Sequence, residues 1–360
     1  FYDTATTHPH LPSIYGPVAQ LWFAGAALIE RAIGDPQAPG IMLGEDSVWR
    51  LNVGFGAWPS GTPLRIALAC AALLATVALL AILLHENASP WWAVLFAWNP
   101  LTVLESGAML HVDIVGVIFL LMSILAARRG NALCAGAMLA LSAGVKPGAV
   151  ALIPWLIRDL RGGRIRAAVA FMATLASLFV PVLAYQHGYR GYVATLYTFA
   201  TNWEFNGSIF ELFTHWFGQG SDGWAMVHAK QHARILASAV VAVTALIAWF
   251  ARGSVASSAY WLFLVAALVS PVVYPWYLLW LLALVPVLRG QAGWATLVWS
   301  GTVVLSYVVW HRPTWRVPPS IAVLEYSPVF AALLIESALV IRRAIIARQD
   351  RSSEPSAPCS

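Results

Sequence analysis

The sequence predicts an all-α protein built as a polytopic bundle of transmembrane helices. Of its 360 residues, 60% are hydrophobic and only 10% are charged, whereas soluble domains are about 25% charged. Long apolar runs follow one another through short polar connections, and about 20 apolar residues suffice to cross a bilayer. The 18 tryptophans fit the aromatic belts that form at membrane interfaces. Together these features exclude an ordinary soluble domain.

Apolar runs of nearly sufficient length to cross a membrane occur about eleven times along the chain. The predicted spans are residues 64–84, 91–110, 114–127, 132–145, 147–157, 167–185, 235–250, 259–270, 275–288, 294–310 and 329–346. Pro147 ends one run and starts the next, so the span at 147–157 could be half of a broken helix. Because the chain begins at Phe1 inside a polar stretch, we expect an upstream piece that carries one more span.

The arginines predict the orientation of these spans. Arginine-rich connections occur at residues 128–129, 158–166, 252, 289 and 342–351, and two predicted spans separate each connection from the next. Cytoplasmic loops concentrate Lys and Arg, so we expect all five connections on the cytoplasmic side. The opposite face then carries residues 1–63, 111–113, 146, 186–234, 274 and 311–327, which include every unusual polar cluster of the chain.

This orientation divides the chain into five segments. They are an outer loop at 1–63 with a juxtamembrane helix at 17–34, a transmembrane bundle at 64–185, an outer loop at 186–234, a second bundle part at 235–348 and a disordered cytoplasmic tail at 349–360. The segment at 17–34 is apolar enough to cross. A crossing there would place Arg128 and Arg129 outside, so we interpret it as an interfacial helix on the outer surface.

The most unusual stretch is residues 99–113, which places Glu105, His111 and Asp113 inside apolar sequence. An ionisable side chain at the bilayer centre costs about 3 kcal/mol, and such residues persist where they line a functional cavity. We therefore interpret the stretch as one wall of an active site at a membrane surface. On one helix Glu105 and Asp113, eight residues apart, would lie nearly on one face and about 12 Å apart in rise. Asp113 could cap the next helix, or Asp113 and His111 could bind or deprotonate an acceptor hydroxyl.

Two cations on the same face are candidate phosphate ligands. Lys146 interrupts apolar sequence just before Pro147, and Arg65 starts a predicted span. A lone lysine there could merely snorkel to the interface, but it could equally neutralise an anionic phosphate, which is the role we favour.

The opening stretch, residues 8–17, contains three prolines that hold the backbone extended. It could be a plain surface loop, or a rigid rim that presents Tyr15, His8 and His10 to a substrate. Two histidines alone are weak evidence for a metal, so no metal site is predicted.

Two aromatic stretches complete the candidate site. In the outer loop, Trp203, Glu204 and Asn206 combine ring, carboxylate and amide groups, which suits sugar recognition; a membrane-skimming loop is the alternative. Tyr274 and Trp276 lie in a proline-punctuated turn between two spans. They could form part of an interfacial belt or line a groove for a lipid chain.

Other classes of function lack support. The three cysteines show neither disulfide nor metal spacing, and no Walker or dinucleotide-binding pattern occurs. No cofactor is therefore predicted, and a dependence on divalent metals stays open. The net charge of +5 resides mainly in short loops, as membrane topology requires, so it does not indicate nucleic-acid binding.

Taken in order, these stretches resemble the polytopic glycosyltransferases of the GT-C superfamily, in particular the bacterial family 87 type that includes polyprenyl-phosphate-mannose-dependent mannosyltransferases. The matching stretches are His-Pro-x-Leu-Pro at 8–20, Asn-Pro-Leu…Glu…His-x-Asp at 99–113, Lys-Pro at 146–147, Trp-Glu-Phe-Asn-Gly-Ser at 203–208 and Ser-Pro…Pro-Trp-Tyr at 270–277. Ser13 and Gly16 depart from the family pattern, which has Thr and Pro there.

The resemblance implies an enzyme that transfers a hexose, which is mannose in this family type, from a polyprenyl-phosphate donor to a hydroxyl of a glycan or lipid acceptor. Transfer would occur on the non-cytoplasmic face of a bacterial inner membrane, in contact with its lipids. GT-C enzymes usually carry a catalytic acid in the first outer loop; Asp3 is a candidate, and we expect the main acid upstream. The superfamily also places a juxtamembrane helix after that loop. Two alternatives remain: a transporter or lipid flippase, which should show repeated halves, and a non-catalytic scaffold subunit.

Overall fold

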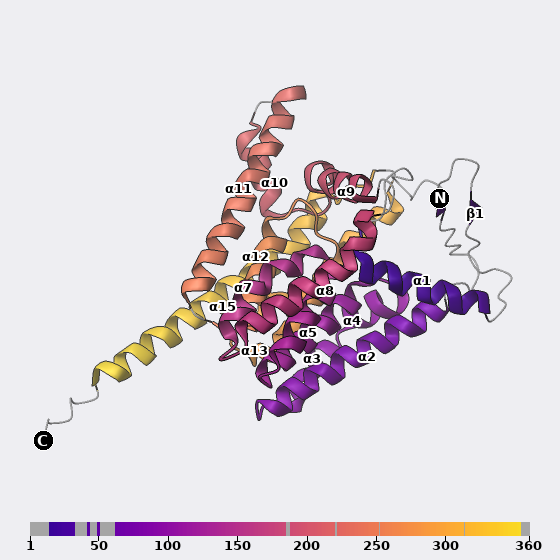
Figure 1. The fold of residues 1–360 in the computed structure, drawn as a ribbon. Helices are drawn as coiled ribbons and strands as arrows, with labels where there is room; N and C mark the ends of the chain where they lie inside the picture. Colours follow the sequence, from indigo (N-terminus) through magenta and orange to yellow (C-terminus); the bar gives the residue numbers. More distant parts are fainter. Residues whose placement is uncertain are drawn as a thin grey trace, which may run out of the picture.

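The computed structural model describes residues 14–32, 42–43, 49–50, 62–184, 188–219, 222–251, 253–312 and 314–353. Within them the protein is a bundle of helices (Figure 1), and the strands are one two-residue antiparallel pair, β1 (Met42–Leu43) and β2 (Trp49–Arg50). The predicted all-α class is confirmed.

The first half of the bundle runs from α1 to α8. Its helices are α1 (Pro17–Ala32), α2 (Thr62–His85), η1 (Pro90–Ala93), α3 (Val94–Ala97), α4 (Pro100–Val103), η2 (Leu104–Ala108), α5 (Asp113–Arg128), α6 (Ala132–Val145), η3 (Pro147–Leu152), α7 (Ile153–Asp159) and α8 (Arg164–Ala184).

The second half runs from α9 to α15. Its helices are α9 (Gly188–Asn202), α10 (Ile209–Phe217), α11 (Gly223–Phe250), α12 (Val255–Val269), η4 (Pro275–Tyr277), α13 (Leu278–Leu288), α14 (Trp294–Thr302), η5 (Val303–His311) and α15 (Pro319–Ser353).

Four helical segments in the described residues are long and apolar enough to cross a membrane. They are Thr62–His85, Arg164–Ala184, Gly223–Phe250 and Pro319–Leu339, and the shorter apolar helices include Ala132–Val145, Val255–Val269 and Pro275–Leu288. The chain is thus a membrane protein, but the predicted count of about eleven spans is not confirmed. Three predicted spans are broken: 91–110 divides into η1, α3, α4 and η2, 147–157 divides into the 3-10 helix η3 and α7, and 294–310 divides into α14 and the 3-10 helix η5.

The break in the predicted span 91–110 has a local cause. Pro100 begins α4, and the Asn99 side chain accepts a hydrogen bond from Leu101 N at 3.0 Å, which caps a new helix start. Proline lacks the N–H that a continuous helix would use. Apolar composition alone therefore did not establish helix continuity here.

The segment predicted as an outer loop, 186–234, is largely helical. It contains α9, α10 and the first part of α11, which begins at Gly223 rather than near residue 235. In Figure 1, α10 and α11 rise side by side away from the rest of the bundle. At the other end of the chain, α15 continues to Ser353, so it includes the first residues of the predicted tail.

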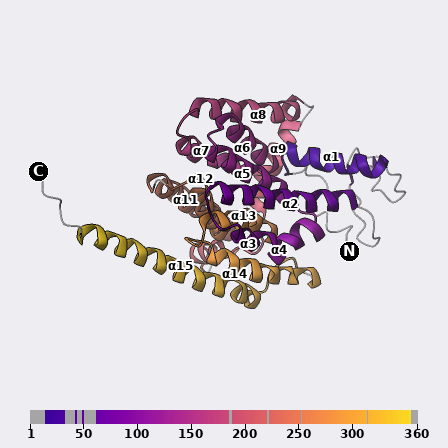
Figure 2. The ribbon, with the colours of Figure 1, turned by 90° about the horizontal axis from the view of Figure 1, so that it is seen from below.

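The core centres on α5, α6 and α13. Seen from below (Figure 2), α8 and α6 lie to one side of α5, and α14 and α15 lie to the other, beyond α13. Ser142 on α6 donates to the Gly116 carbonyl of α5 at 2.8 Å, and Ser123 on α5 donates to the Ala135 carbonyl of α6 at 2.8 Å. These bonds satisfy buried hydroxyl groups while drawing the two helices together.

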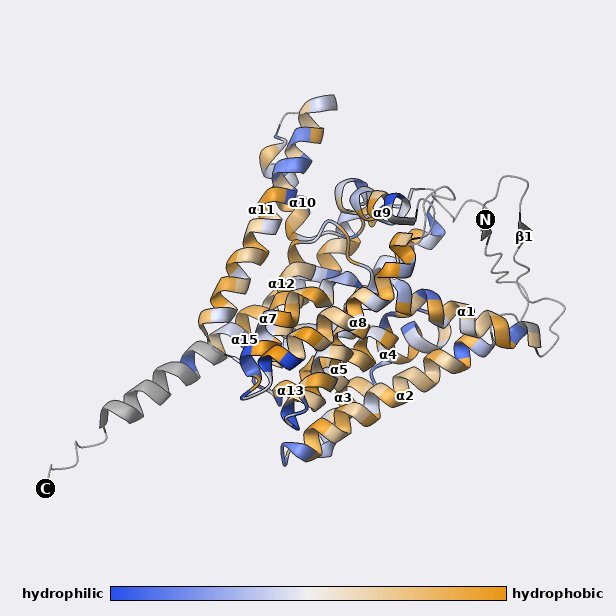
Figure 3. Cartoon of the chain, in the orientation of Figure 1, coloured by the Kyte–Doolittle hydropathy of each residue, from blue (hydrophilic) through white to orange (hydrophobic). Residues whose placement is uncertain are grey.

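Basic connections meet at one end of the bundle. Glu86 accepts an ion pair from Arg128 at 3.0 Å and another from Arg289 at 3.4 Å. Arg158 donates to the Trp249 carbonyl at 2.7 Å near the end of α11. Figure 3 shows the hydrophilic residues of this end below the apolar helices. Asp113 starts α5 and Arg128 ends it, so the acidic candidate and the basic connections lie about 22 Å apart along the helix.

Candidate active site

The backbone between Glu105 and Asp113 is not one helix. Residues 104–108 form a π-helix, and the His111 N–H donates to the Glu105 carbonyl at 2.9 Å. Leu110 has φ 62°, a left-handed conformation that ends the helix before α5 begins at Asp113. The expected common face and 12 Å rise are therefore wrong. The π-turn, a feature frequent at functional sites, gives each acidic residue its own surroundings.

Asp113 is fully buried and ties three elements together. Its Oδ1 accepts hydrogen bonds from Lys146 Nζ at 2.8 Å and from Trp280 Nε1 at 2.8 Å. Both donors are side chains, so these bonds go beyond a helix cap. Asp113 Oδ2 is buried without a hydrogen-bond partner in the described part of the chain.

Glycine at position 116 makes this arrangement possible. Gly116 lies one helical turn after Asp113, and a Cβ there would overlap the Trp280 ring. Because Gly116 has no side chain, Trp280 on α13 can approach α5 closely and reach the Asp113 carboxylate.

Lys146 is held in the gap between α6 and η3. Its backbone is extended, with φ −141° and ψ 122°, because the following Pro147 disfavours helical geometry. Its ammonium lies 3.4 Å from the centre of the Tyr277 ring, in a cation–π contact, and its side chain is 29% exposed. Asp113 and Tyr277 thus hold the Lys146 ammonium in place, while part of the lysine side chain stays accessible.

Tyr15 joins this cluster from the other end of the chain. The adjacent Gly16 N–H donates to the Val145 carbonyl at 3.2 Å, and a Cβ on Gly16 would overlap the Gly144 carbonyl oxygen. Burial, and next the negative charge of Asp113, raise the pKa of the Tyr15 hydroxyl, so it stays protonated. The close glycine contact explains why glycine suits a position where the resembling family has proline.

A second cluster surrounds Glu105, which is also fully buried. His111 Nδ1 lies 2.8 Å from Glu105 Oε2, and the Tyr307 hydroxyl donates to Glu105 Oε1 at 2.6 Å. Neither His111 Nδ1 nor Glu105 Oε2 makes a hydrogen bond of regular geometry in the described part of the chain. Glu105 therefore places its carboxylate against the His111 imidazole as a charged neighbour.

A stack of aromatic rings connects His111 with Phe205, which lies between α9 and α10. The His111 ring lies on Trp276 at 3.6 Å between centroids, Trp276 lies on Tyr274 at 4.4 Å, and Tyr274 lies on Phe205 at 4.6 Å. Tyr274 and Trp276 are thus brought to the Asp113 region, as side chains of one continuous ring stack.

Two backbone hydrogen bonds join the 203–208 segment to the 271–273 turn. The Phe205 N–H donates to the Pro271 carbonyl and the Val273 N–H donates to the Phe205 carbonyl, both at 2.8 Å. Asn206, at φ 53°, turns away and donates to both oxygens of buried Glu325, at 3.0 and 3.1 Å. Glu325 also accepts from Trp299 at 3.0 Å. Asn206 therefore anchors the segment rather than facing the Lys146 cluster.

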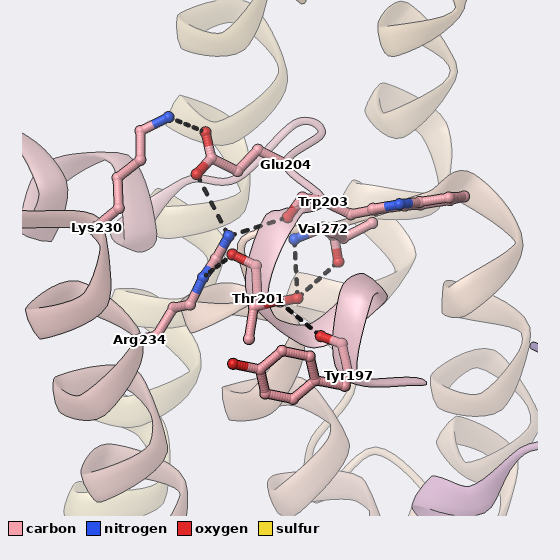
Figure 4. Close-up of polar contacts among 8 residues, drawn as sticks. Tyr197, Thr201, Trp203, Glu204, Lys230, Arg234 and Val272 are labelled. Carbon is pink, nitrogen blue, oxygen red and sulfur yellow. Dashed lines mark hydrogen bonds and ion pairs between the residues drawn. The ribbon is translucent and has the colours of Figure 1, made fainter. Parts of the chain in front are cut away.

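Glu204 points to the opposite side, toward α11 (Figure 4). It accepts an ion pair from Lys230 at 2.6 Å and one from Arg234 at 3.4 Å. Arg234 also donates to the Thr201 carbonyl at 3.0 Å. Trp203 packs its ring on Phe199 with centroids 5.0 Å apart.

The remaining predicted residues lie apart from the cluster or outside the described residues. Arg65 Nη1 donates to the Ala108 carbonyl at 2.8 Å, so it supports the end of the π-helix. Asp3, His8 and His10 lie outside the described residues, and their roles stay predictions. Among the described residues, no group of three or more His, Cys, Asp or Glu side chains could hold a metal ion.

Sequence reasoning missed four residues of these clusters as site residues. Tyr277 ends the 270–277 stretch and Trp280 lies three residues beyond it, where aromatic residues are equally typical of an interfacial belt. Tyr307 and Glu325 are isolated polar groups in or beside apolar runs, which is the one signal that could have identified them.

One protein family matches most of this chain. The profile of glycosyltransferase family 87 matches residues 53–275, more than half of the chain. No curated protein and no solved structure matches the chain. The matched region contains Glu105, His111, Asp113 and Lys146. The chain therefore belongs to glycosyltransferase family 87 and is a membrane glycosyltransferase.

Proposed function

We propose that this glycosyltransferase transfers a hexose, mannose in the first instance, from a polyprenyl-phosphate donor to a hydroxyl of a glycan or lipid acceptor. The observation that supports this proposal most strongly is the position of Lys146. Its ammonium is held by buried Asp113 and by the Tyr277 ring, while its side chain stays partly exposed. A fixed cation at the end of an apolar helix suits a donor with an anionic phosphate and an isoprenoid chain.

The lipid-facing surface supports a membrane-embedded donor. Large apolar side chains on three long helices are more than half exposed, among them Leu73 on α2, Met172 on α8 and Leu246 on α11. In lipid these side chains contact acyl or isoprenoid chains rather than water. An isoprenoid-linked donor is compatible with this lipid-facing surface.

In the proposed reaction, the bond from the sugar C1 to the phosphate oxygen breaks, and its electron pair leaves with the phosphate. The ammonium of Lys146 stabilises that developing charge. The acceptor oxygen forms the new bond to C1, and its proton passes to a base at the site. Among the described residues, the His111 imidazole is the candidate for this proton, because it is part of the same 99–113 stretch as Asp113 and lies against the carboxylate of Glu105. Asp113 holds Lys146, and Asp3 stays a predicted alternative base.

We place the reaction on the non-cytoplasmic face of a bacterial inner membrane. Asp113 and Lys146 lie at the ends of α5 and α6 that are opposite to Arg128. The positive-inside rule puts the arginine-rich end in the cytoplasm.

The direct test is transfer in liposomes. Purified protein is mixed with radiolabelled polyprenyl-phosphate mannose and an alkyl mannoside acceptor, and the labelled product is separated from the lipid donor. We expect a product that depends on both substrates. Absence of product with mannose, glucose and galactose donors would contradict the proposed function.

A further inference from the structure

A cavity lies between α10 and α11, away from the Lys146 cluster. Its volume is about 250 Å³, and its lining includes Glu204, Phe210, Glu211, Thr214 and His215. Pockets for drug-sized ligands measure about 300–1,000 Å³. This cavity is smaller, so it suits a single sugar ring.

Three polar groups of the cavity, those of Glu211, Thr214 and His215, come from one face of α10, and Glu204 precedes this helix. Glu211, Thr214, His215 and Gly218 have the spacing i, i+3, i+4, i+7, so they share one side of the helix. Leu212 and Trp216, 65% and 66% exposed, lie elsewhere on the helix surface. The side chain of Phe210 contributes an almost fully buried ring to the cavity wall.

These groups offer several positions to a ligand with hydroxyl groups. Thr214 Oγ1 is buried without a hydrogen-bond partner in the described part of the chain, and a buried hydroxyl favours having one. Glu204 is fixed from behind by Lys230 and Arg234. Burial, and next the charge of Glu204, raise the pKa of Glu211, whereas the charges of Arg316 and Lys230 lower it. Two carboxylates, a hydroxyl and an imidazole beside an aromatic ring provide the groups that bind the hydroxyls and an apolar face of a sugar.

The cavity is connected with the Lys146 cluster through the 203–208 segment. Pro271 lines the cavity and accepts the backbone hydrogen bond of Phe205. The Phe205 ring starts the stack that ends at His111, three ring-to-ring steps away. A sugar unit in the cavity is therefore separated from His111 by this ring stack and is not the unit that reacts.

We infer that the α10–α11 cavity is an acceptor subsite, which binds a non-reacting hexose unit of a neutral saccharide while the reacting unit lies near His111 and Lys146. This inference rests on the proposed function for the identity of the reacting site. It predicts that the enzyme prefers acceptors of three or more sugar units, because three ring-to-ring steps separate the cavity from His111.

Saccharide binding tests the subsite without turnover. Saturation-transfer NMR on the full chain in detergent uses methyl glycosides of mannobiose, maltose and lactose as probes. We expect at least one disaccharide to bind, and Glu211→Gln and Thr214→Val each to weaken its binding fivefold or more. Thr244→Val, on the transmembrane part of α11, is the matched control and leaves binding unchanged. Thermal unfolding of each variant verifies that it is folded.

Two results would overturn the subsite: no binding of any disaccharide to the wild-type protein, or equal binding by the wild type and both folded cavity variants. Failure of the proposed function is a separate outcome, because it shows as absence of transfer from polyprenyl-phosphate hexoses while saccharide binding persists. If both hold, the cavity variants raise the acceptor KM and leave the donor KM unchanged.

Discussion

Lys146 and Asp113 form an ion pair of 2.8 Å between the end of α6 and the start of α5. The pair is asymmetric, because the aspartate side chain is 1% exposed and the lysine side chain 29% exposed. A buried carboxylate that also accepts from Trp280 can move little, so it holds the ammonium at a defined place. The roles of the two residues can therefore be separated by substitution.

Asp113→Asn keeps the shape of the side chain and removes its charge. We expect turnover to fall about a hundredfold or more while the protein stays folded, because Lys146 loses the partner that positions it. The measurement is transfer from a polyprenyl-phosphate sugar, with thermal unfolding recorded alongside. Asparagine caps a helix about as well as aspartate, so full activity in Asp113→Asn would leave only a capping role.

Glu105→Gln tests the role of the Glu105 carboxylate beside His111. The amide of glutamine can still accept the Tyr307 hydroxyl, but the charge beside the imidazole is lost. We expect kcat to fall about tenfold to a hundredfold, because the imidazole loses the charged group that lies 2.8 Å from it. Tyr307→Phe removes one hydrogen bond, worth about 1 kcal/mol, and should alter stability more than kcat. Equal kcat values for wild type and folded Glu105→Gln would refute this role of Glu105.

Gly16→Ala tests the docking of the Tyr15 segment. Its methyl group would overlap the Gly144 carbonyl oxygen, and overpacking of this kind costs about 1–3 kcal/mol. We expect a lower unfolding temperature and reduced transfer. Gly25→Ala is the matched control within α1, because nothing lies within 4 Å of its Cβ and alanine favours a helix by about 0.5–1 kcal/mol. Equal effects of the two substitutions would show that the contact is unimportant.

Cysteine labelling tests the orientation in the membrane. Cys70, Cys134 and Cys359 are first replaced by alanine, and single cysteines are then placed at Gly162 and Gln219. Gly162 has open space around its Cβ, whereas Gly163 has φ 73° and would be strained by any side chain. We expect an impermeant maleimide to label Gln219→Cys from the periplasm and Gly162→Cys only after lysis. Labelling of both from one side would disprove the orientation.

The sequence predicted the charged residues of the site better than their surroundings. Glu105, Asp113 and Lys146 are conspicuous because each interrupts apolar sequence, where an ionisable group is costly. Trp280 is one of 18 tryptophans, so composition does not single it out. Its hydrogen bond to Asp113 depends on the space left by Gly116, and this contact between two helices cannot be predicted from composition.

Local backbone geometry accounts for the wrong expectations. The left-handed turn at Leu110 has no glycine or proline signal, so residues 99–113 read as one helix. In the 186–234 segment, conversely, the helical spacing of Glu211, Thr214, His215 and Gly218 was available in the sequence. It was overlooked because the segment was interpreted as a loop.

Donor-phosphate binding to Lys146 variants tests the central proposal most directly. Binding of polyprenyl phosphate to the purified protein is titrated for wild type, Lys146→Ala, Lys146→Arg and the control Arg129→Ala, with thermal unfolding measured for each. A charge-assisted hydrogen bond contributes about 1.5–3 kcal/mol, so we expect the Kd to rise about tenfold to a hundredfold in Lys146→Ala. The rise should be smaller in Lys146→Arg and absent in Arg129→Ala. Wild-type affinity in folded Lys146→Ala would contradict a phosphate-binding role and leave Lys146 a structural partner of Asp113 and Tyr277.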